Sequence, residues 1–168
     1  DETGIVPYGA TAPTHALMGR WGNVFLVNGE PRWKASVSRG DVVRFYLTNV
    51  SSARVYNLAF AGARLKVVAS DGGRFEREVW ARSIVIAPAE RYVVDVRFDS
   101  AGAVALTNEV QALDHMYGTY AAETDTLGIV SVTPTTAAAR RSSTGEAFER
   151  LREDAAVAGV RARYRAPF

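Results

Sequence analysis

Short runs in which apolar and polar residues alternate cover the chain from residue 23 to residue 133. In the run 91–98 every second residue is apolar, and the residues between them include Asp95 and Arg97. The run 41–49 follows the same rule. A period of two places alternate side chains on opposite faces of a β-strand, so both runs predict strands with one apolar and one more polar face. Further β-branched and aromatic runs predict strands at residues 24–28, 35–38, 53–60, 64–70, 83–87, 103–107 and 126–133.

Turn-forming residues separate these runs about every 8–12 residues. Asn28-Gly29 and Asp71-Gly72-Gly73 provide residues that tolerate a positive φ, and Pro88 has a fixed φ. Short strands with this spacing are typical of a β-sandwich or barrel. The sequence therefore predicts an all-β domain of two packed sheets.

Beyond Pro134 the composition changes to small and polar residues, which predicts a linker. Ser143, three residues before Glu146, matches a capping box at the start of a helix. An apolar stripe at helical spacing and a glycine at the expected C-cap follow at Phe148, Leu151, Ala155, Ala158 and Gly159. A lone helix of about four turns is marginal in water. We expect it to pack either against the sandwich of this chain or against a further domain.

The composition is that of one globular domain, with 168 residues, 48% of them hydrophobic and 23% charged. There is no cysteine, which excludes disulfides and thiolate chemistry in this chain. The net charge is +2, and the basic excess lies in residues 137–168, where seven Arg accompany four acidic residues. Residues 1–136 lack the basic stripe that nucleic-acid binding requires. No apolar run approaches the roughly 18 residues needed to cross a bilayer.

Residues suited to catalysis or metal binding are few. His15 and His115 lie 100 residues apart instead of in a cluster of ligands, and we interpret both as surface residues. No nucleophile elbow or phosphate-binding glycine motif is present. Asn49-Val50-Ser51 has the form of a glycosylation sequon. Two pairs of close carboxylates are typical of polar strand faces: Glu76 with Glu78, and Asp95 with Asp99. We therefore expect no catalytic, cofactor-binding or metal-ligating residue in this chain.

Five blocks of sequence, in order, resemble the middle domain of multicopper oxidases. They are VFLVNG at 24–29, GDVVRFYLTN at 40–49, YNL at 56–58, ASDGG at 69–73 and IAPAERYVVDV at 86–96. The resemblance covers about residues 22–133, and the ordered succession is more specific than any single block. The family's usual Pro-Gly-Glu-Arg turn reads Pro88-Ala89-Glu90-Arg91 here, which predicts mild strain if Ala89 must adopt φ > 0.

The resemblance implies a cupredoxin-like Greek-key β-sandwich, the second of three in a laccase-like or metallo-oxidase chain. In that family, His-x-His pairs and a His-Cys-His segment in the first and third domains bind copper, and neither motif occurs in this sequence. The implied role is that of a non-catalytic, copper-free domain that orients its copper-bearing neighbours. The implied parent oxidises a substrate, reduces O2 to water, and works in the periplasm, at the cell surface or as a secreted protein.

The resemblance also implies a division of the chain. Residues 1–21 would lead in from a preceding domain, residues 22–136 would form the sandwich, and residues 137–168 would contain a linker, the helix and the start of the next domain. The implied partners are the flanking cupredoxin domains of the same polypeptide. Phe148, Leu151 and Tyr164 would then pack against the following domain. The long segment 108–125 would be a loop that contacts a neighbouring domain or covers the end of the sandwich.

Other functions fit parts of the same pattern. A copper-free relative with the same three-domain fold would serve as a scaffold in the cell envelope, and its flanking domains would lack the copper ligands. A free-standing sandwich that binds carbohydrate or protein would need an exposed aromatic platform and a self-contained tail. A mononuclear copper carrier is excluded, because its site needs two His and one Cys.

Overall fold

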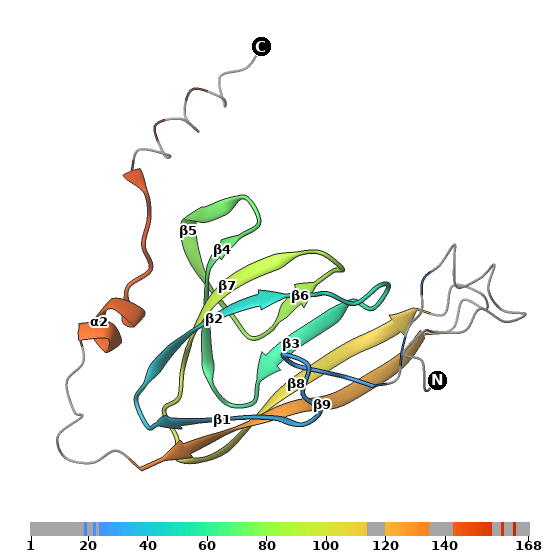
Figure 1. Ribbon diagram of the computed structural model, residues 1–168. Coiled ribbons are helices and arrows are strands. Elements are labelled where there is room, and N and C mark those ends of the chain that lie inside the picture. Colours follow the sequence, from blue (N-terminus) through green and yellow to red (C-terminus); the bar gives the residue numbers. More distant parts are fainter. Residues whose placement is uncertain are drawn as a thin grey trace, which may run out of the picture.

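Two β-sheets packed face to face form the body of the molecule (Figure 1). The computed structural model describes residues 19, 22, 24–113, 120–134, 143–155, 159 and 163. The first sheet has the order β1 (Trp33–Ser38), β9 (Tyr120–Thr133), β8 (Gly102–Leu113), β3 (Tyr56–Phe60) and β6 (Ile84–Ile86). The second has the order β2 (Val42–Thr48), β7 (Arg91–Arg97), β4 (Arg64–Ser70) and β5 (Gly73–Ala81). The predicted all-β sandwich is confirmed, with one short helix, α2 (Ser143–Glu149), after it.

The chain crosses repeatedly between the two sheets. β1 pairs with β9 in parallel, with Trp33 opposite Gly128, and the other strand pairs are antiparallel. β2 and β7, the two strands with the clearest alternation in the sequence, pair along their whole length from Val42–Arg97 to Thr48–Arg91.

The hydrophobic core fills the space between the sheets. Val94 and Val96 of β7 and Val130 of β9 are completely buried there. Aromatic rings cross the core from one sheet to the other: the ring centroids of Phe45 and Phe60 are 4.7 Å apart, and Phe60 meets Phe98 edge to face at 6.0 Å. Such aromatic contacts add to the stabilisation that burial of apolar area provides. This interior joins the two sheets into a single unit.

The strand expected at 24–28 is absent, and β5 occurs where no strand was expected. Residues 24–28 form only an isolated bridge between Val27 and Glu30, around a turn in which Asn28 has φ 54° and Gly29 φ 80°. β5 has a bulge in its pairing with β4 between positions 74 and 79, and charged residues interrupt its alternation. A bulge shifts the two-residue period, which is why the pattern of this edge strand gives no strand signal.

The segment 108–125 is a β-hairpin arm and not the expected loop. β8 and β9 remain paired from Gly102–Val132 to Leu113–Tyr120. The other strands of the sheet stop earlier, since β3 reaches only Asn108 and β1 only Gly128. Figure 1 shows β8 and β9 continuing past the rest of the sandwich (yellow and orange). The tip that connects them, which includes His115, lies outside the described residues.

The helix predicted over 143–159 is interrupted after Glu149, where α2 ends. Residues 151–154 are not helical and include a bridge between Glu153 and Arg77 of β5, and Ala155 is helical again. Gly159 has a helical conformation without the positive φ of the expected cap. The cause of the early stop is tertiary, because the last turn of α2 and the strand after it bond to side chains and backbone of the sandwich.

Ala89 has the positive φ on which its predicted strain depends, 68°. It follows Pro88 in a turn in which the N–H of Glu90 donates to the carbonyl of Ala87. A left-handed φ costs a non-glycine residue about 1–2 kcal/mol. Glycine removes this cost but increases the conformational entropy of the unfolded chain, which offsets part of the stabilisation.

We expect Ala89→Gly to raise the free energy of unfolding by about 0.5 kcal/mol, measured by urea denaturation. The matched control is Ala87→Gly in the same turn, where φ is not positive and glycine is expected to lower stability by a similar amount. A loss of stability in Ala89→Gly would show that the left-handed conformation carries no strain.

Candidate functional site

The described part of the chain has no cluster of three or more His, Cys, Asp or Glu side chains that could hold a metal ion. His15 and His115 lie outside that part. The whole sequence lacks the cysteine that a blue copper site requires, and its two histidines are too few for a cluster of copper ions held by imidazoles. The donor set of this chain therefore does not fit the copper sites of the family it resembles.

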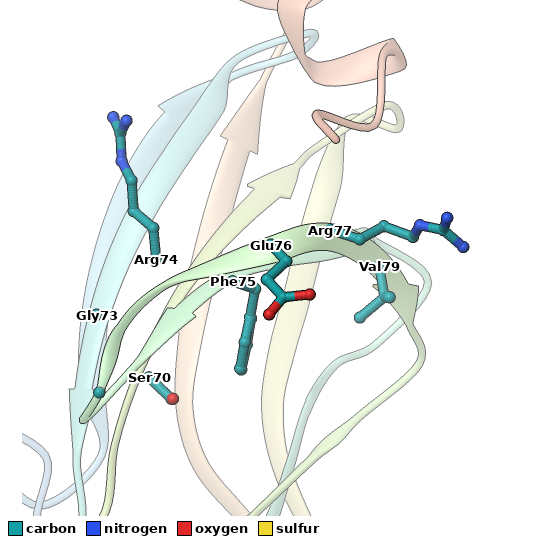
Figure 2. Close-up of a pocket in the computed structure, with 8 residues that line it drawn as sticks. Ser70, Gly73, Arg74, Phe75, Glu76, Arg77 and Val79 are labelled. Carbon is teal, nitrogen blue, oxygen red and sulfur yellow. The ribbon is translucent and has the colours of Figure 1, made fainter. Parts of the chain in front are cut away.

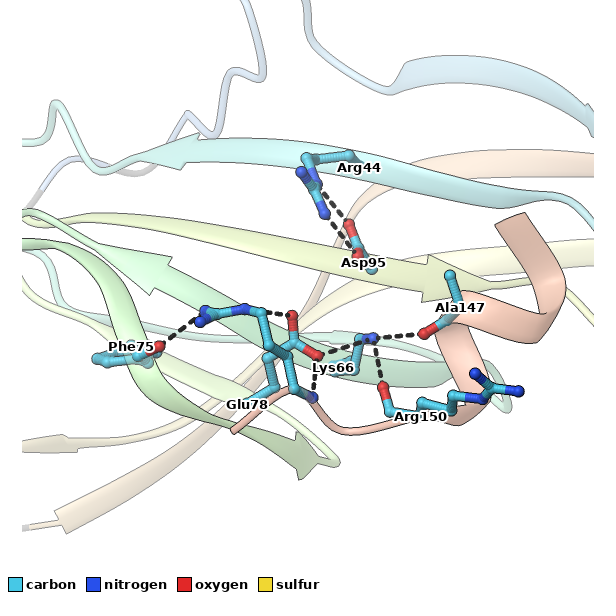
Figure 3. Close-up of polar contacts among 8 residues, drawn as sticks. Arg44, Lys66, Phe75, Glu78, Asp95, Ala147 and Arg150 are labelled. Carbon is cyan, nitrogen blue, oxygen red and sulfur yellow. Dashed lines mark hydrogen bonds and ion pairs between the residues drawn. The ribbon is translucent and has the colours of Figure 1, made fainter. Parts of the chain in front are cut away.

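Asp95 and Asp99, one of the two carboxylate pairs seen in the sequence, belong to separate ion pairs. Arg44 donates two hydrogen bonds to Asp95, from Nε at 2.7 Å and Nη2 at 2.9 Å (Figure 3), and these bonds raise the pKa of the guanidinium. Asp99 instead pairs with Arg97, at 2.7 Å. Bidentate arginine–carboxylate pairs fix the relative geometry of the two side chains. Neither aspartate is arranged as a general acid or base.

A buried ionic cluster, here called the clasp, joins Lys66 on β4, Glu78 on β5 and Arg152 after α2. Lys66 is 3% exposed and Glu78 7% exposed, and their Nζ and Oε2 atoms are 3.1 Å apart (Figure 3). The backbone N–H of Arg152 donates to the same Oε2 at 2.9 Å, and Arg152 Nε lies 3.6 Å from Oε1. The clasp was not predicted, although a lysine within the apolar run Leu65-Lys66-Val67-Val68 is a signal for a buried, paired charge.

Beside the clasp, α2 packs on the same face of the second sheet. Phe148 is 1% exposed and meets Trp80 edge to face, with the ring centroids 4.9 Å apart. Arg64 donates two hydrogen bonds to Glu149, and Arg97 donates a third at 2.6 Å. Arg64 lowers the pKa of the Glu149 carboxyl mainly through its hydrogen bonds, and Arg97 lowers it further.

The expectation that Phe148 lacks a partner within this chain is therefore wrong, because the sandwich itself buries it. Leu151 is 41% exposed, and Tyr164 lies outside the described residues.

An apolar cavity of about 500 Å³ opens at one end of the sandwich, between the sheets. Its walls include Phe25, Phe45 and Tyr56, and its rim carries the exposed apolar side chains Leu26, Tyr46 and Val50. The cavity contains no pair of ionisable groups suited to catalysis. It has the character of a contact surface.

A second hollow lies at the β4–β5 hairpin and is polar. It is lined by backbone at Gly72 and Gly73 and by the side chains of residues 74–77. Figure 2 shows Arg74 and Arg77 extending in different directions, and Arg77 is bound by Glu153. These two cations do not converge on a common anion.

Asn49, the sequon residue, is 4% exposed. Its side-chain nitrogen donates to the carbonyls of Arg54 and Ile86 at 2.8 and 3.0 Å, and its oxygen accepts from Ser51. A side chain so placed organises the loop between β2 and β3 and is closed to a sugar.

Comparison with known proteins gives consistent results. Residues 8–125 match the family model described as multicopper oxidase. The chain is 36% identical over 108 residues to the cell division protein FtsP of Proteus mirabilis, covering 64% of this chain and 22% of that protein. It is 37% identical over 78 residues to a laccase of Bacillus subtilis, covering 46% of this chain and 15% of that protein.

Solved structures of multicopper oxidases have a similar fold. A variant of the multicopper oxidase McoA from Aquifex aeolicus superimposes with a TM-score of 0.62 at 31% identity, over 71% of this chain and 27% of that one. A multicopper oxidase from Campylobacter jejuni, described as a metallo-oxidase, gives a TM-score of 0.61 at 25% identity, over 73% and 26% of the two chains. The two-sheet sandwich is thus cupredoxin-like. The chain spans between 15 and 27% of the length of these four proteins.

No helix among the described residues is long and apolar enough to cross a membrane.

Proposed function

Because the chain belongs to the multicopper oxidase family, we propose that it is the copper-free middle domain of a three-domain protein. The flanking domains of that protein bind copper and couple the oxidation of a substrate to the reduction of O2 to water. The observation that carries this proposal is a complete sandwich of the family's fold whose sequence has no cysteine and only two histidines. The role of the domain is then to hold its neighbours in a fixed relation to each other.

The packing of the sandwich supports a structural role. Its core is continuous from sheet to sheet, and the ion pairs of the clasp and of Arg44 with Asp95 serve contacts between strands or with α2. The exposed apolar rim of the end cavity is suited to contact with another protein surface. We further propose that the parent acts outside the cytoplasm, in the periplasm, at the cell surface or as a secreted protein.

A second candidate is a scaffold domain in a copper-free relative. The 36% identity to a protein named for cell division, and not for oxidase activity, is the observation that favours this alternative. The sandwich itself serves equally well in both proteins. The flanking domains decide between the two, because only the oxidase carries clustered histidines and a cysteine there.

The experiment compares copper in this chain with copper in the same chain extended by its native flanking regions. Copper(II) is titrated by calorimetry and by visible absorption, and bound metal is counted by mass spectrometry of the intact protein. We expect no stoichiometric copper site in this chain. After the heat of copper binding to single imidazoles is subtracted, we expect the same weak heat signal from the wild type and from His15→Ala/His115→Ala. We expect stoichiometric copper with defined absorption in the extended protein.

A stoichiometric copper site in this chain alone, lost in the double histidine variant, would overturn the proposal. An extended protein that folds but binds no copper would favour the scaffold alternative.

A further inference from the structure

We propose that the outer face of β4 and β5 is a docking site for residues 143–154, here called the strap. We also propose that this docking fixes the direction in which the polypeptide leaves the sandwich. The second part rests on the proposed function, since it gives the middle domain a means of orienting the domain that follows. The docking itself does not depend on that function.

Lys66 is the centre of the site. An ammonium group has three donors, and all three are used: one on Glu78 Oε2 at 3.1 Å, and one each on the carbonyls of Ala147 and Arg150 at 3.2 Å (Figure 3). The last two acceptors are unpaired carbonyls at the C-terminal end of α2, where a cation is favoured. Without the strap, this buried cation would keep only one of its three partners. Two of the three partners of this buried charge therefore belong to the strap.

The aromatic contact places α2 on the sheet next to Lys66. Phe148 is covered by Trp80, by the guanidinium of Arg64 at 5.5 Å from its ring centroid, and by Lys66 Nζ at the same distance. Trp80 remains 38% exposed even with the strap in place. Loss of the strap would expose this apolar contact on the outer face of the sheet.

The bulge in β5 explains why the strap continues as an extended strand. Positions 75–78 have no partner on β4, because the register passes directly from Arg74–Ala69 to Val79–Val67. The strap bonds to this stretch: the N–H of Glu78 donates to Arg152 O at 3.0 Å, and the N–H of Asp154 donates to Glu76 O at 2.8 Å. Arg152 Nη2 also donates to Phe75 O at 2.7 Å. The irregular edge strand is thus completed by the strap, as an added strand completes a sheet.

These contacts hold the strap at both ends, by α2 and by residues 152–154. The structural unit accordingly extends to residue 154, beyond the boundary at residue 136 that the sequence predicts. Residues after 154 leave from a point that the β5 edge determines. A domain that begins there would inherit a defined starting position.

The chain provides a simple chemical test, because it contains only two lysines. Lys34 on β1 is exposed, whereas Lys66 is buried beneath the strap. Acetylation of the intact chain with an N-hydroxysuccinimide ester is followed by mass spectrometry of both sites. We expect Lys34 to react at least about 100-fold faster than Lys66, because Lys66 must wait for local opening.

Phe148→Ala weakens the strap without touching the core of the sandwich. We expect it to accelerate acetylation of Lys66 on the order of 100-fold, as burial of a phenylalanine side chain implies, and to leave Lys34 unchanged. Leu151→Ala is the matched control in the same segment, and we expect it to change the Lys66 rate less than about threefold because Leu151 is 41% exposed. An unchanged Lys34 rate and an intact urea transition establish that the sandwich remains folded.

Equal reactivity of the two lysines in the wild-type chain would overturn the docking proposal. So would full protection of Lys66 in the double variant Phe148→Ala/Glu149→Ala, since the strap would then not be what covers it.

The direction of the outgoing chain is tested separately. With no native cysteine, spin labels attach cleanly at Thr48→Cys on β2 and Ala155→Cys after the strap, both exposed positions. We expect a single narrow distribution of the distance between the two labels, and a broader distribution when Phe148→Ala is added. A broad distribution in a chain whose Lys66 is protected would retain the docking and refute the orienting role. Copper content measured in the extended protein is independent of both results, so a failure of the proposed function remains distinguishable.

Discussion

Replacement of Asn49 with alanine is expected to lower the free energy of unfolding by about 3 kcal/mol. The Asn49 side chain donates to the carbonyls of Arg54 and Ile86 and accepts from both the backbone and the hydroxyl of Ser51. Alanine removes these bonds in a place that water does not reach. A buried polar group left without a partner costs about 1–3 kcal/mol, and the carbonyl of Ile86 would be one of them.

The measurement is urea denaturation of the intact chain, with Thr48→Ala as control. Thr48 is the exposed neighbour of Asn49, and its truncation is expected to change stability by less than about 0.5 kcal/mol. Asn49→Asp separates donors from acceptors, because it keeps the bonds to Ser51 and loses both bonds to the carbonyls. A loss below about 1 kcal/mol in Asn49→Ala would mean that the loop re-forms its bonds without this residue.

Replacement of Gly128 with alanine is expected to lower the free energy of unfolding by a similar amount, about 3 kcal/mol, for a steric reason. Gly128 lies opposite Trp33 in the parallel pairing of β9 with β1. A Cβ atom there would come within 2.6 Å of the Trp33 carbonyl oxygen and 2.8 Å of its ring atom Cε3. The oxygen belongs to the backbone of a paired strand, so relief requires β1 to move and the Trp33–Phe45 contact to loosen.

Gly145→Ala in α2 provides the control, since no atom other than the neighbouring backbone of α2 lies within 4 Å of its Cβ position, and alanine favours helix. Stability is compared by urea denaturation, and hydrogen exchange of residues 33–38 reports whether β1 has detached. Normal stability together with normal protection of β1 in Gly128→Ala would show that the two strands have room for a methyl group.

The sequence predicted the strands whose side chains obey a local rule. β7 and β2 alternate cleanly because one face of each meets the core, and β4 contains a mostly apolar run, so the sequence-based bounds lie within a residue or two of those observed. The hairpin arm was not predictable in this way, because beyond Asn108 and Asp125 its strands pair only with each other.

The same distinction between local and long-range properties applies to the candidate sites. The lack of a cysteine and of clustered histidines is a property of composition, so the absence of a copper ligand set could be argued from the sequence. The clasp brings together positions 66, 78 and 152, and no local pattern relates them. The amphipathic stripe from Phe148 predicted a longer helix, but bonds from Lys66 and β5 outweigh local helix propensity, which is a weak preference.

The parallel pairing of β1 with β9 has a consequence for synthesis on the ribosome. Trp33 can pair with Gly128 only after Gly128 has been synthesised, 95 residues later. At a synthesis rate of about 5–20 residues per second, this interval lasts roughly 5–19 s. The sandwich cannot close during that time, and the emerging chain must keep the apolar side of β1 from other partners. Translation pauses after residue 133 would lengthen the time available for closure before any following domain emerges, whereas pauses before it would prolong exposure.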